Sequence, residues 1–391
     1  CPVSRIDDLI RDLCPDGVEY KPLGEILNYE QPGPYLVSSK EYNLSYPTPV
    51  LTAGTTFILG HTNEKHGIYS ASQDSPAIIF DDFTTASKWV DFPFKAKSSA
   101  MKILTSSSGN PVDLRYTYYV LDALNYTPST HSRHWISIFS NMQIAFPPRK
   151  VREYIVSTLN RFKALEAELE AELEARQHQF TYYRDHLVTG LQQVQIVPIK
   201  DVGELQRGRR FTRNDMVDEG IPAIHYGEIY TTYGHKTDST TSFVKDEIEP
   251  KLRFAQPGDV IIAAVGETVA DVGTGVAWLG STPIAYHDDS FALHHDQDPR
   301  YISHALRTSE YHRQKDRFVS RAKVKRLSAR GIEQIRIPLP ELDEQRRIAD
   351  ILDDFDTLVN NLSSGLPAEI EARRKQYEYY RDRLLTFPEK K

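Results

Sequence analysis

Two stretches of the chain space their apolar residues by three, four or seven positions. In the first, from about 148 to 189, this stripe consists of Phe162, Leu165, Leu169, Leu173, Phe180, Tyr183 and Leu187. In the second, from 342 to 385, it consists of Ile348, Leu352, Phe355, Leu358, Leu362, Ile370, Tyr377, Tyr380 and Leu384. Such spacing places the apolar side chains on one side of an α-helix. The pattern therefore predicts two long amphipathic helices.

Each predicted helix is far longer than the average of about 11 residues, so a small domain cannot bury its whole stripe. At about 1.5 Å per residue, the first helix spans on the order of 60 Å. We expect the two helices to pack on each other, antiparallel, because this buries both stripes. Gly365 and Pro367 in the second stretch suit a helix end and a helix start. We therefore expect an interruption at 363–367.

The two helices belong to an internal repeat. The run YYRDHL at 182–187 recurs as YYRDRL at 379–384, and EAR at 174–176 recurs at 371–373. Further upstream, positions 155, 159, 162 and 165 match 348, 352, 355 and 358. The segments that open the two intervening regions also correspond, 18–26 with 194–202. Self-similarity of this kind indicates that one framework occurs twice.

The regions between the repeated segments share little else. Both contain short β-branched and aromatic runs, such as 77–80 and 260–265, separated by Gly, Pro and Asp, which is typical of globular domains with strands. Residues 48–54 have no counterpart in the second region. We predict an α/β (α+β) fold with a pseudo-twofold repeat, in which two long antiparallel helices separate two globular domains. The expected divisions are 1–147, with a helix at 4–13, a spacer helix at 148–190, a second domain at 191–340 and a second spacer helix at 341–391.

Composition and charge are those of a soluble protein with more than one domain. The chain has 391 residues, of which 40% are hydrophobic, and no run approaches the roughly 20 apolar residues of a membrane span. Cys1 and Cys14 are too few for a disulfide framework or a structural zinc site, and a reducing cytoplasm is expected. The net charge of −7 does not by itself support nucleic-acid binding, so any cationic surface must be local.

The sequence carries no convincing catalytic motif. A DNA methyltransferase needs a glycine-rich loop and an Asn/Asp-Pro-Pro-aromatic motif, whereas Pro147 and Pro148 follow Phe146 and the GTG run at 273–275 is a weak match. The PD run at 15–16 and EYK at 19–21 are too close together for a metal-dependent nuclease. His61 and His66 could be combined with Asp81 or Asp82, but no spacing supports a metal site. We predict a protein without enzymatic activity, cofactor or metal.

The order of parts resembles the specificity subunits of type I restriction-modification enzymes. The run EARRKQYEYYRD at 371–382 is similar to the distal repeated region of that family, and 174–187 to its central one. LCPDGVEY at 13–20 and FDDFTTA at 80–86 are also similar to family members. The resemblance implies two target recognition domains, each reading half of a bipartite DNA sequence, and helices that set the spacing. It also implies two methyltransferase subunits as partners and, through them, motor-nuclease subunits.

DNA binding needs cations for phosphates and hydrogen-bonding side chains for base edges. In the second domain the candidates are Arg207, Arg209, Arg210, Arg213, Tyr226, Tyr230, Tyr233, Lys236, Arg321, Lys323, Lys325 and Arg326. In the first domain they are Asn63, Lys65, His66, Thr84, Thr85, Lys88, Trp89, Lys97, Ser98, Arg133 and His134. We expect the arginines around Gly208 to contact phosphates and Arg326 to contact bases, because Arg326 and Arg133 precede their helices at similar distances.

A second interpretation also fits the sequence. The acidic balance and the striped helices would suit a helical adaptor that joins two protein partners without reading DNA. The different domains carried on one repeated frame argue against the adaptor.

Overall fold

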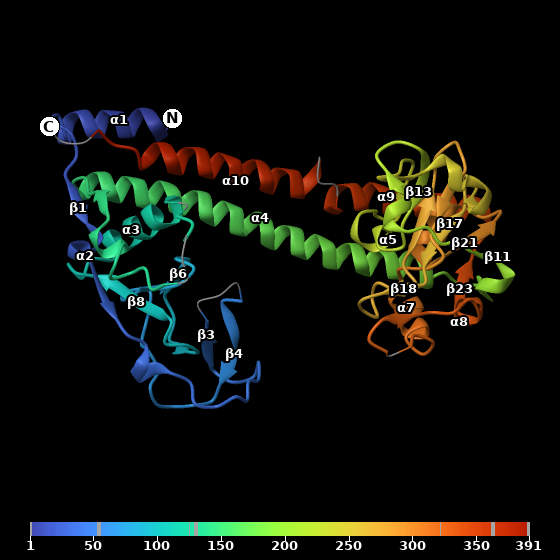
Figure 1. Cartoon of the computed structure of the whole chain (residues 1–391), viewed down its shortest axis with the longest axis horizontal. Coiled ribbons are helices and arrows are strands. Elements are labelled where there is room, and N and C mark those ends of the chain that lie inside the picture. Colours follow the sequence, from blue (N-terminus) through green and yellow to red (C-terminus); the bar gives the residue numbers. More distant parts are fainter. Residues whose placement is uncertain are drawn as a thin grey trace. The chain divides into compact units, whose positions relative to one another are not determined.

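The structure is a computed structural model that describes residues 2–52, 56–124, 126–128, 132–320, 322–360 and 364–388. The chain forms two compact units. Unit 1 consists of residues 1–168 and 371–391, and unit 2 of residues 169–370. Helix α4 (Arg149–Thr189) contributes its first half to unit 1 and its second half to unit 2 (Figure 1).

The long helices predicted from the stripes are present. The first prediction, 148–189, agrees with α4, and the second stretch forms α9 (Leu342–Asn360) and α10 (Gly365–Leu384). Gly365 has a φ of +71°, a backbone conformation that glycine adopts without a Cβ clash. The helix is therefore interrupted where the sequence indicated, although residues 361–363 lie outside the described part of the chain.

Within unit 1, α4 and α10 pack antiparallel. The rings of Phe162 and Tyr380 stack with centroids 5.2 Å apart. One turn further along α4, Glu166 Oε1 lies 2.7 Å from Nε of Arg374, which comes earlier in α10. Residue numbers thus rise along one helix as they fall along the other, as expected.

Within unit 2, the second half of α4 packs on α9. The rings of Phe180 and Tyr183 lie 5.4 and 6.0 Å from that of Phe355. Phe355 corresponds to Phe162 in the sequence repeat, and Tyr183 to Tyr380. The same tyrosine–phenylalanine contact therefore occurs once in each unit.

Unit 1 is built on a four-stranded antiparallel sheet in the order β2-β8-β5-β6, with α3 packed against it. A smaller sheet has the order β4-β3-β7, and β1 pairs with β9. The elements are α1 (Pro2–Leu13), β1 (Tyr20–Pro22), α2 (Leu23–Ile26), β2 (Leu27–Glu30), β3 (Thr48–Leu51), β4 (Ile58–Thr62), β5 (Ala77–Asp81), β6 (Ser87–Val90), β7 (Lys95–Ala96), β8 (Met101–Ser106), α3 (Pro111–Ala123) and β9 (Gln143–Ala145).

Unit 2 contains two five-stranded sheets, β11-β21-β17-β19-β14 and β12-β15-β13-β20-β16, and two-stranded pairings β10-β23 and β18-β22. Its strands are β10 (Gln195–Pro198), β11 (Gly203–Arg207), β12 (Met216–Val217), β13 (Ile221–Ile224), β14 (Lys236–Thr237), β15 (Ser242–Val244), β16 (Phe254–Ala255), β17 (Val260–Ala263), β18 (Val265–Gly266), β19 (Gly275–Trp278), β20 (Ile284–Tyr286), β21 (Ser290–His295), β22 (Lys325–Arg326) and β23 (Arg336–Leu339). Its short helices are α5 (Glu228–Thr231), α6 (Pro299–Ala305), α7 (Ser309–Lys315) and α8 (Ala329–Gln334).

The two units share a strand framework that their sequences do not reveal. The order β2-β8-β5-β6 corresponds to β11-β21-β17-β19, with the same antiparallel pairing. Ile79 faces Ile103 in unit 1, and Ile261 faces Ala292 in unit 2. Even β3, in the segment without a counterpart in sequence, pairs parallel with β7 as β13 pairs with β20. Residues 48–51 thus have an equivalent in strand pairing although their sequence has no counterpart in the second region, and residues 53–54 lie outside the described part.

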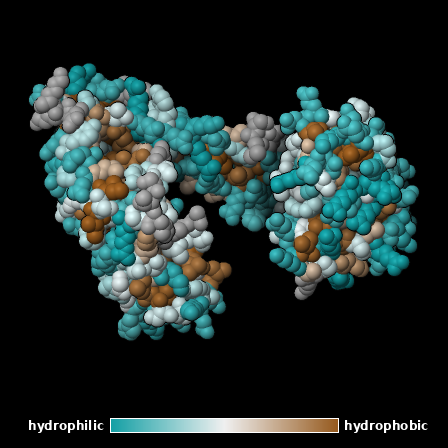
Figure 2. All heavy atoms as spheres, in the orientation of Figure 1, coloured by the Kyte–Doolittle hydropathy of each residue, from teal (hydrophilic) through white to brown (hydrophobic). Residues whose placement is uncertain are grey.

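The apolar stripes are only partly buried, since Tyr183 and Leu358 stay 40% and 44% exposed. Figure 2 shows apolar residues in small groups among polar ones on the visible face of each unit. Ile155, Leu159, Ile348 and Leu352 are all fully buried. Among the described helices, none has both the length and the apolar character that crossing a bilayer requires.

Candidate nucleic-acid interface

Four cationic residues of unit 2, from two segments distant in sequence, line one pocket. Arg209 and Arg210 line it together with Lys251 and Arg253, and its volume is about 520 Å³. Pro250 and Leu252 complete the lining, so no carboxylate lies among the lining residues. We call this set the basic pocket; it comprises Arg209, Arg210, Lys251 and Arg253.

Gly208 directly precedes Arg209 and Arg210, at a place where the backbone passes very close to another turn. A Cβ on Gly208 would lie 2.1 Å from the carbonyl oxygen of His287, so only glycine fits against the turn between β20 and β21. The Gly208 N–H donates to the carbonyl of Ser290 at 3.1 Å, and the Arg209 N–H to that of Tyr286 at 3.2 Å. These bonds fix the backbone while both arginine side chains stay exposed.

Two other arginines of the predicted set converge on acidic residues. Arg326 Nη1 lies 3.2 Å from Oδ1 of Asp289. Arg207 donates from Nε to the carbonyl of Asp288 at 2.7 Å, and its Nη2 lies 3.9 Å from the same Asp289 oxygen. We call Arg207, Asp288, Asp289 and Arg326 the tethered cluster. The structure therefore separates Arg207 from its sequence neighbours Arg209 and Arg210.

The remaining cations of unit 2 have different surroundings. Arg213 is exposed at the start of a short 3₁₀-helix that Thr212 and Asp215 cap, and hydrogen bonds from Thr212 lower the pKa of Asp215. Lys323 is exposed, and Lys325 donates to the carbonyl of Ala322 at 2.8 Å. Arg321 lies outside the described residues.

The structure divides the predicted polar-aromatic loop of unit 2. Tyr226 packs against His287, with ring centroids 5.3 Å apart, beside the tethered cluster. Burial lowers the pKa of His287. Tyr230 is half-buried on α5, and the Tyr233 hydroxyl lies 3.1 Å from that of Thr241. Of these three tyrosines, Tyr226 is therefore the one with a ring contact to the β20–β21 turn.

Lys236 takes part in a largely buried ion cluster, although its own side chain is 36% exposed. Its Nζ and the Arg300 guanidinium both donate to Asp353 of α9. His235 and His304 reach the other oxygen of Asp353 at 2.6 and 3.2 Å. These two histidines and Asp353 have the spacing of a metal site, but two cations already neutralise the carboxylate. We interpret the cluster as the attachment of α9 to the sheet and leave Lys236 out of the interface proposed below.

In unit 1 a strained turn joins β5 to β6. Asp81 accepts hydrogen bonds from the N–H groups of Phe83 and Thr84 at 2.8 and 3.2 Å. Thr85 has a φ of +63°, which is unusual for a β-branched residue. Backbone strain of this kind is concentrated at functional sites. Thr84 is exposed at the tip of the turn.

A buried ion pair holds this turn against the segment around 134. Asp82 lies 3.1 Å from Nζ of Lys102, and both side chains are buried. The same carboxylate accepts from the N–H groups of His134 and Trp135 at 3.1 and 2.8 Å. The structure thus brings together parts of two predicted stretches, 84–89 and 131–135, of which residue 131 lies outside the described part. His134 itself is only 1% exposed, so we leave it out of the interface proposed below, whereas Arg133 is exposed.

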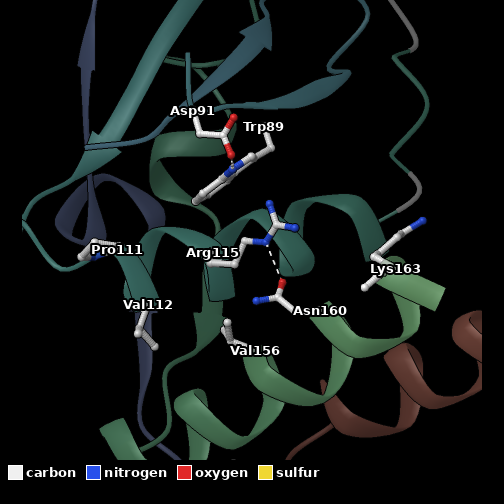
Figure 3. A pocket seen from close by; sticks show the side chains of 9 residues that line it. Trp89, Asp91, Pro111, Val112, Arg115, Val156, Asn160 and Lys163 are labelled. Carbon is white, nitrogen blue, oxygen red and sulfur yellow. Dashed lines mark hydrogen bonds between the residues drawn. The ribbon is translucent and has the colours of Figure 1, made fainter. Parts of the chain in front are cut away.

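Trp89 does not share the environment of Thr84. It lines a cavity of about 560 Å³ between β6, α3 and the first half of α4 (Figure 3). The Arg115 guanidinium lies 4.4 Å from the centre of the indole ring and donates to Asn160 at 3.0 Å. Trp89 therefore packs toward the helices. Lys88 lines a different, smaller cavity with Thr84 and Thr85, of about 260 Å³.

The other candidates of unit 1 lie around β4 and β7. Asn63, Lys65 and His66 are exposed in the segment after β4. The carbonyl of His66 accepts from Nζ of Lys95 at 2.6 Å, which orders this segment. Lys97 is exposed and donates to the Tyr42 hydroxyl at 2.9 Å, and the Ser98 hydroxyl accepts from the N–H of Ala100 at 3.1 Å.

Sequence reasoning missed several residues of the interface. Lys251 and Arg253 were not predicted, although the run PKLR at 250–253 carries two cations beside a proline. Asp288 and Asp289 were not predicted either, since their approach to Arg207 and Arg326 arises only in the folded chain. Only the meeting of the β20–β21 turn with Arg207 and Arg326 gives these carboxylates a role.

Comparisons with known proteins agree with this architecture. The family model of the Type I restriction modification DNA specificity domain matches residues 192–372. The specificity subunit of the type I restriction enzyme EcoR124I/EcoR124II from Escherichia coli is 41% identical over 390 residues, covering 95% of each chain.

Two solved structures have a similar fold at low sequence identity. One, reported under complex assembly and conformational transition of the type I R-M system, has a TM-score of 0.60, 13% identity and coverage of 94% of this chain and 97% of that one. The S subunit from M. genitalium has a TM-score of 0.53, 15% identity and coverage of 94% and 96%. The chain belongs to the specificity subunits of type I restriction-modification systems, which recognise DNA and are not catalytic.

Proposed function

We propose that this chain reads a bipartite DNA sequence, with one half-site for each globular domain. In this proposal the domains are residues 1–147 and 191–340, and the helices at 148–190 and 341–391 set the spacing. One observation carries most of the argument. The N–H of His134 donates to the backbone carbonyl of Asp82, and that of Leu327 to the backbone carbonyl of Ala264, both at 2.9 Å. Each acceptor directly follows its strand, β5 or β17, so Arg133 and Arg326, which precede the two donors, occupy equivalent positions.

Both arginines are exposed, yet their surroundings differ completely. Arg133 lies beside the strained Thr84–Thr85 turn, and Arg326 lies beside Asp289. An equivalent frame with different polar side chains suits two modules that read different base sequences, because base edges are distinguished by the pattern of donors and acceptors.

The helices offer a surface for partner subunits. Tyr182 and Tyr379 match in the repeat, and they are 65% and 61% exposed. Exposed aromatic residues are enriched at protein interfaces. We propose that these two positions contact two methyltransferase subunits, through which motor-nuclease subunits assemble, and that the complex works in the cytoplasm.

The test combines two measurements. Methylome sequencing of a host that carries this chain with its methyltransferase should show one bipartite methylated motif. Gel-shift titration of the complex should then show preference for that motif over a scrambled duplex across a salt series. An adaptor without DNA readout, the second interpretation, would show neither a motif nor a preference at any salt concentration.

A further inference from the structure

The arginines of unit 2 occur in two electrostatic settings. In the basic pocket four cationic residues line a cavity without a lining carboxylate, and the Arg253 guanidinium donates to the carbonyl of Arg207. In the tethered cluster, two arginines are balanced by two carboxylates. Phosphate binding depends on net positive charge. In the tethered cluster the two carboxylates offset the positive charge of the two arginines. Its arginines need another explanation.

The tethered arginines are exposed and held in place. The side chains of Arg207 and Arg326 are 56% and 57% exposed, whereas that of Asp289 is 21% exposed. An exposed arginine normally loses rotamer freedom when it binds, which costs free energy. A carboxylate that already fixes the guanidinium lowers that cost and limits its directions of approach.

The donors that remain have a geometry suited to guanine. Arg326 uses Nη1 toward Asp289, which leaves the edge formed by Nε and Nη2. Arg207 uses Nε toward the carbonyl of Asp288, which leaves its two terminal nitrogens. Either pair of parallel N–H donors matches the O6 and N7 acceptors of guanine in the major groove.

The position of the cluster depends on strand pairing. β22 carries Arg326 and pairs with β18, and β11 ends at Arg207 beside β21. Asp288 and Asp289 lie in the turn that leads into β21, and the Asp289 carbonyl accepts from Ala264 at 2.9 Å. The backbone of Asp289 is therefore fixed by the sheet, while its side chain is free to orient arginines.

We propose that Arg207 and Arg326 read guanine edges in the half-site of unit 2 and that Asp289 is a positioning residue that aims both. This inference rests on the proposed function and deepens it. It moves Arg207 from the phosphate-binding set to the base-reading set, and it assigns a carboxylate to sequence discrimination. The basic pocket supplies affinity without sequence preference, and the tethered cluster supplies preference at little gain in affinity.

The test uses the complete complex with its methyltransferase. Dissociation constants are measured for the motif duplex, for duplexes with single changes in the half-site of unit 2, and for a random duplex, from low to high salt. The variants are D289N, R326A and R207A. D218N is the matched control, because Asp218 is exposed in the same unit and its loss changes the net charge by the same amount.

We expect D289N to reduce discrimination at guanine positions about tenfold, within the range of one bidentate contact. Binding to the random duplex should be unchanged or slightly tighter, and the salt slope should be unchanged. D218N should leave discrimination intact. In an R207A/R326A background, D289N should cause no further loss, since Asp289 acts through these arginines. Thermal unfolding of each variant shows whether it is folded.

Two outcomes would overturn the proposal. One is that D289N tightens binding to every duplex by the same factor as D218N, with discrimination unchanged, since Asp289 would then be only a repelling charge. The other is a further loss of discrimination, of about the same factor as in the unmodified background, when D289N is added to R207A/R326A. Absence of any sequence preference in the unmodified complex would instead refute the proposed function itself.

Discussion

The two units attach a long helix to a globular domain at equivalent positions with different chemistry. In unit 1, Arg152 of α4 donates to the carbonyl of Pro147 and forms a 2.8 Å ion pair with Asp113 of α3. In unit 2, Gln345 of α9 donates to the carbonyl of Pro340 at 2.8 Å. The prolines match in the repeat. The acceptor carbonyl stays the same while the donor changes from a charged to a neutral side chain.

The polar surfaces of the two units also differ, as the helix attachments at Arg152 and Gln345 do. Unit 1 presents the polar turn around Thr84, which a buried Asp82–Lys102 pair holds. Unit 2 presents the basic pocket and the tethered cluster. The two units therefore share a backbone framework, and each stabilises it with its own charged groups. Substitutions at matched positions can therefore distinguish effects on the stability of the shared framework from effects on binding at the surface of each unit.

The largest expected effect on stability is at the two matched helix attachments, Arg152 and Gln345. Arg152→Ala leaves Asp113 buried without its cation, so we expect the free energy of unfolding of unit 1 to fall by about 3–5 kcal/mol. Gln345→Ala leaves only neutral groups unsatisfied, and we expect roughly 1–3 kcal/mol in unit 2. Urea denaturation followed by hydrogen exchange measures each unit separately. Equal losses of unfolding free energy in the two units would show that the charge of the Arg152 side chain adds nothing beyond the hydrogen bonds.

The next effect concerns acid. Burial lowers the pKa of His304 in unit 2 to about 4, whereas an unfolded chain binds the proton near pH 6.5. The stability from neutral His304 is therefore complete above pH 6.5 and is lost as the pH falls toward 4. Between pH 7 and 5 the loss is about 2 kcal/mol.

Calorimetry at several pH values checks this prediction, with H304Q as the control. The variant should take up about one proton fewer on unfolding in this pH range. Among the described residues, the histidines whose pKa falls to about 4 are His295, His304 and His312, all in unit 2. Acid should thus destabilise unit 2. An identical pH dependence in H304Q would contradict the assignment to His304.

The paired tyrosines provide a third comparison. Tyr380 stacks on Phe162, and Tyr183 packs on Phe355 while staying 40% exposed, whereas Tyr379 and Tyr182 are 61% and 65% exposed and make no such contact with the partner helix among the ring contacts of the described residues. Tyr380→Ala should lower the free energy of unfolding by roughly 2 kcal/mol, less than for a fully buried aromatic residue. Tyr379→Ala should change it by under about 0.5 kcal/mol but weaken methyltransferase binding, as titration calorimetry would measure. Unchanged binding would remove Tyr379 from the proposed partner surface.

The smallest effect concerns salt. Arg209→Ala and Lys251→Ala in the basic pocket should each weaken binding to specific and random duplexes alike. Each should reduce the slope of log K against log salt concentration by about 0.9, the value for one phosphate. Thr84→Ala in unit 1 should leave that slope unchanged. A loss confined to the motif duplex would show that the pocket reads bases.

The sequence alone determined the helices and the repeat. A stripe of period 3.6 predicts an amphipathic helix without knowledge of its partner, and the repeated YYRD runs marked matching positions in α4 and α10. It also indicated the interruption before Gly365, since glycine and proline act on the local backbone. These features are local, and one stretch of chain specifies each of them.

The shared sheets and the site needed the tertiary structure. β5 and β17 are buried along their whole length, so any apolar residue suits them and no alternation or sequence match marks their equivalence. Tyr379 and Tyr380 are neighbours in one motif, and only the partner helix decides which is covered. Asp289 meets Arg326 across 37 positions, and Arg209 meets Lys251 through another turn. Because strand pairing brings these charges together, the tertiary structure alone divides the arginines into a tethered cluster and a basic pocket.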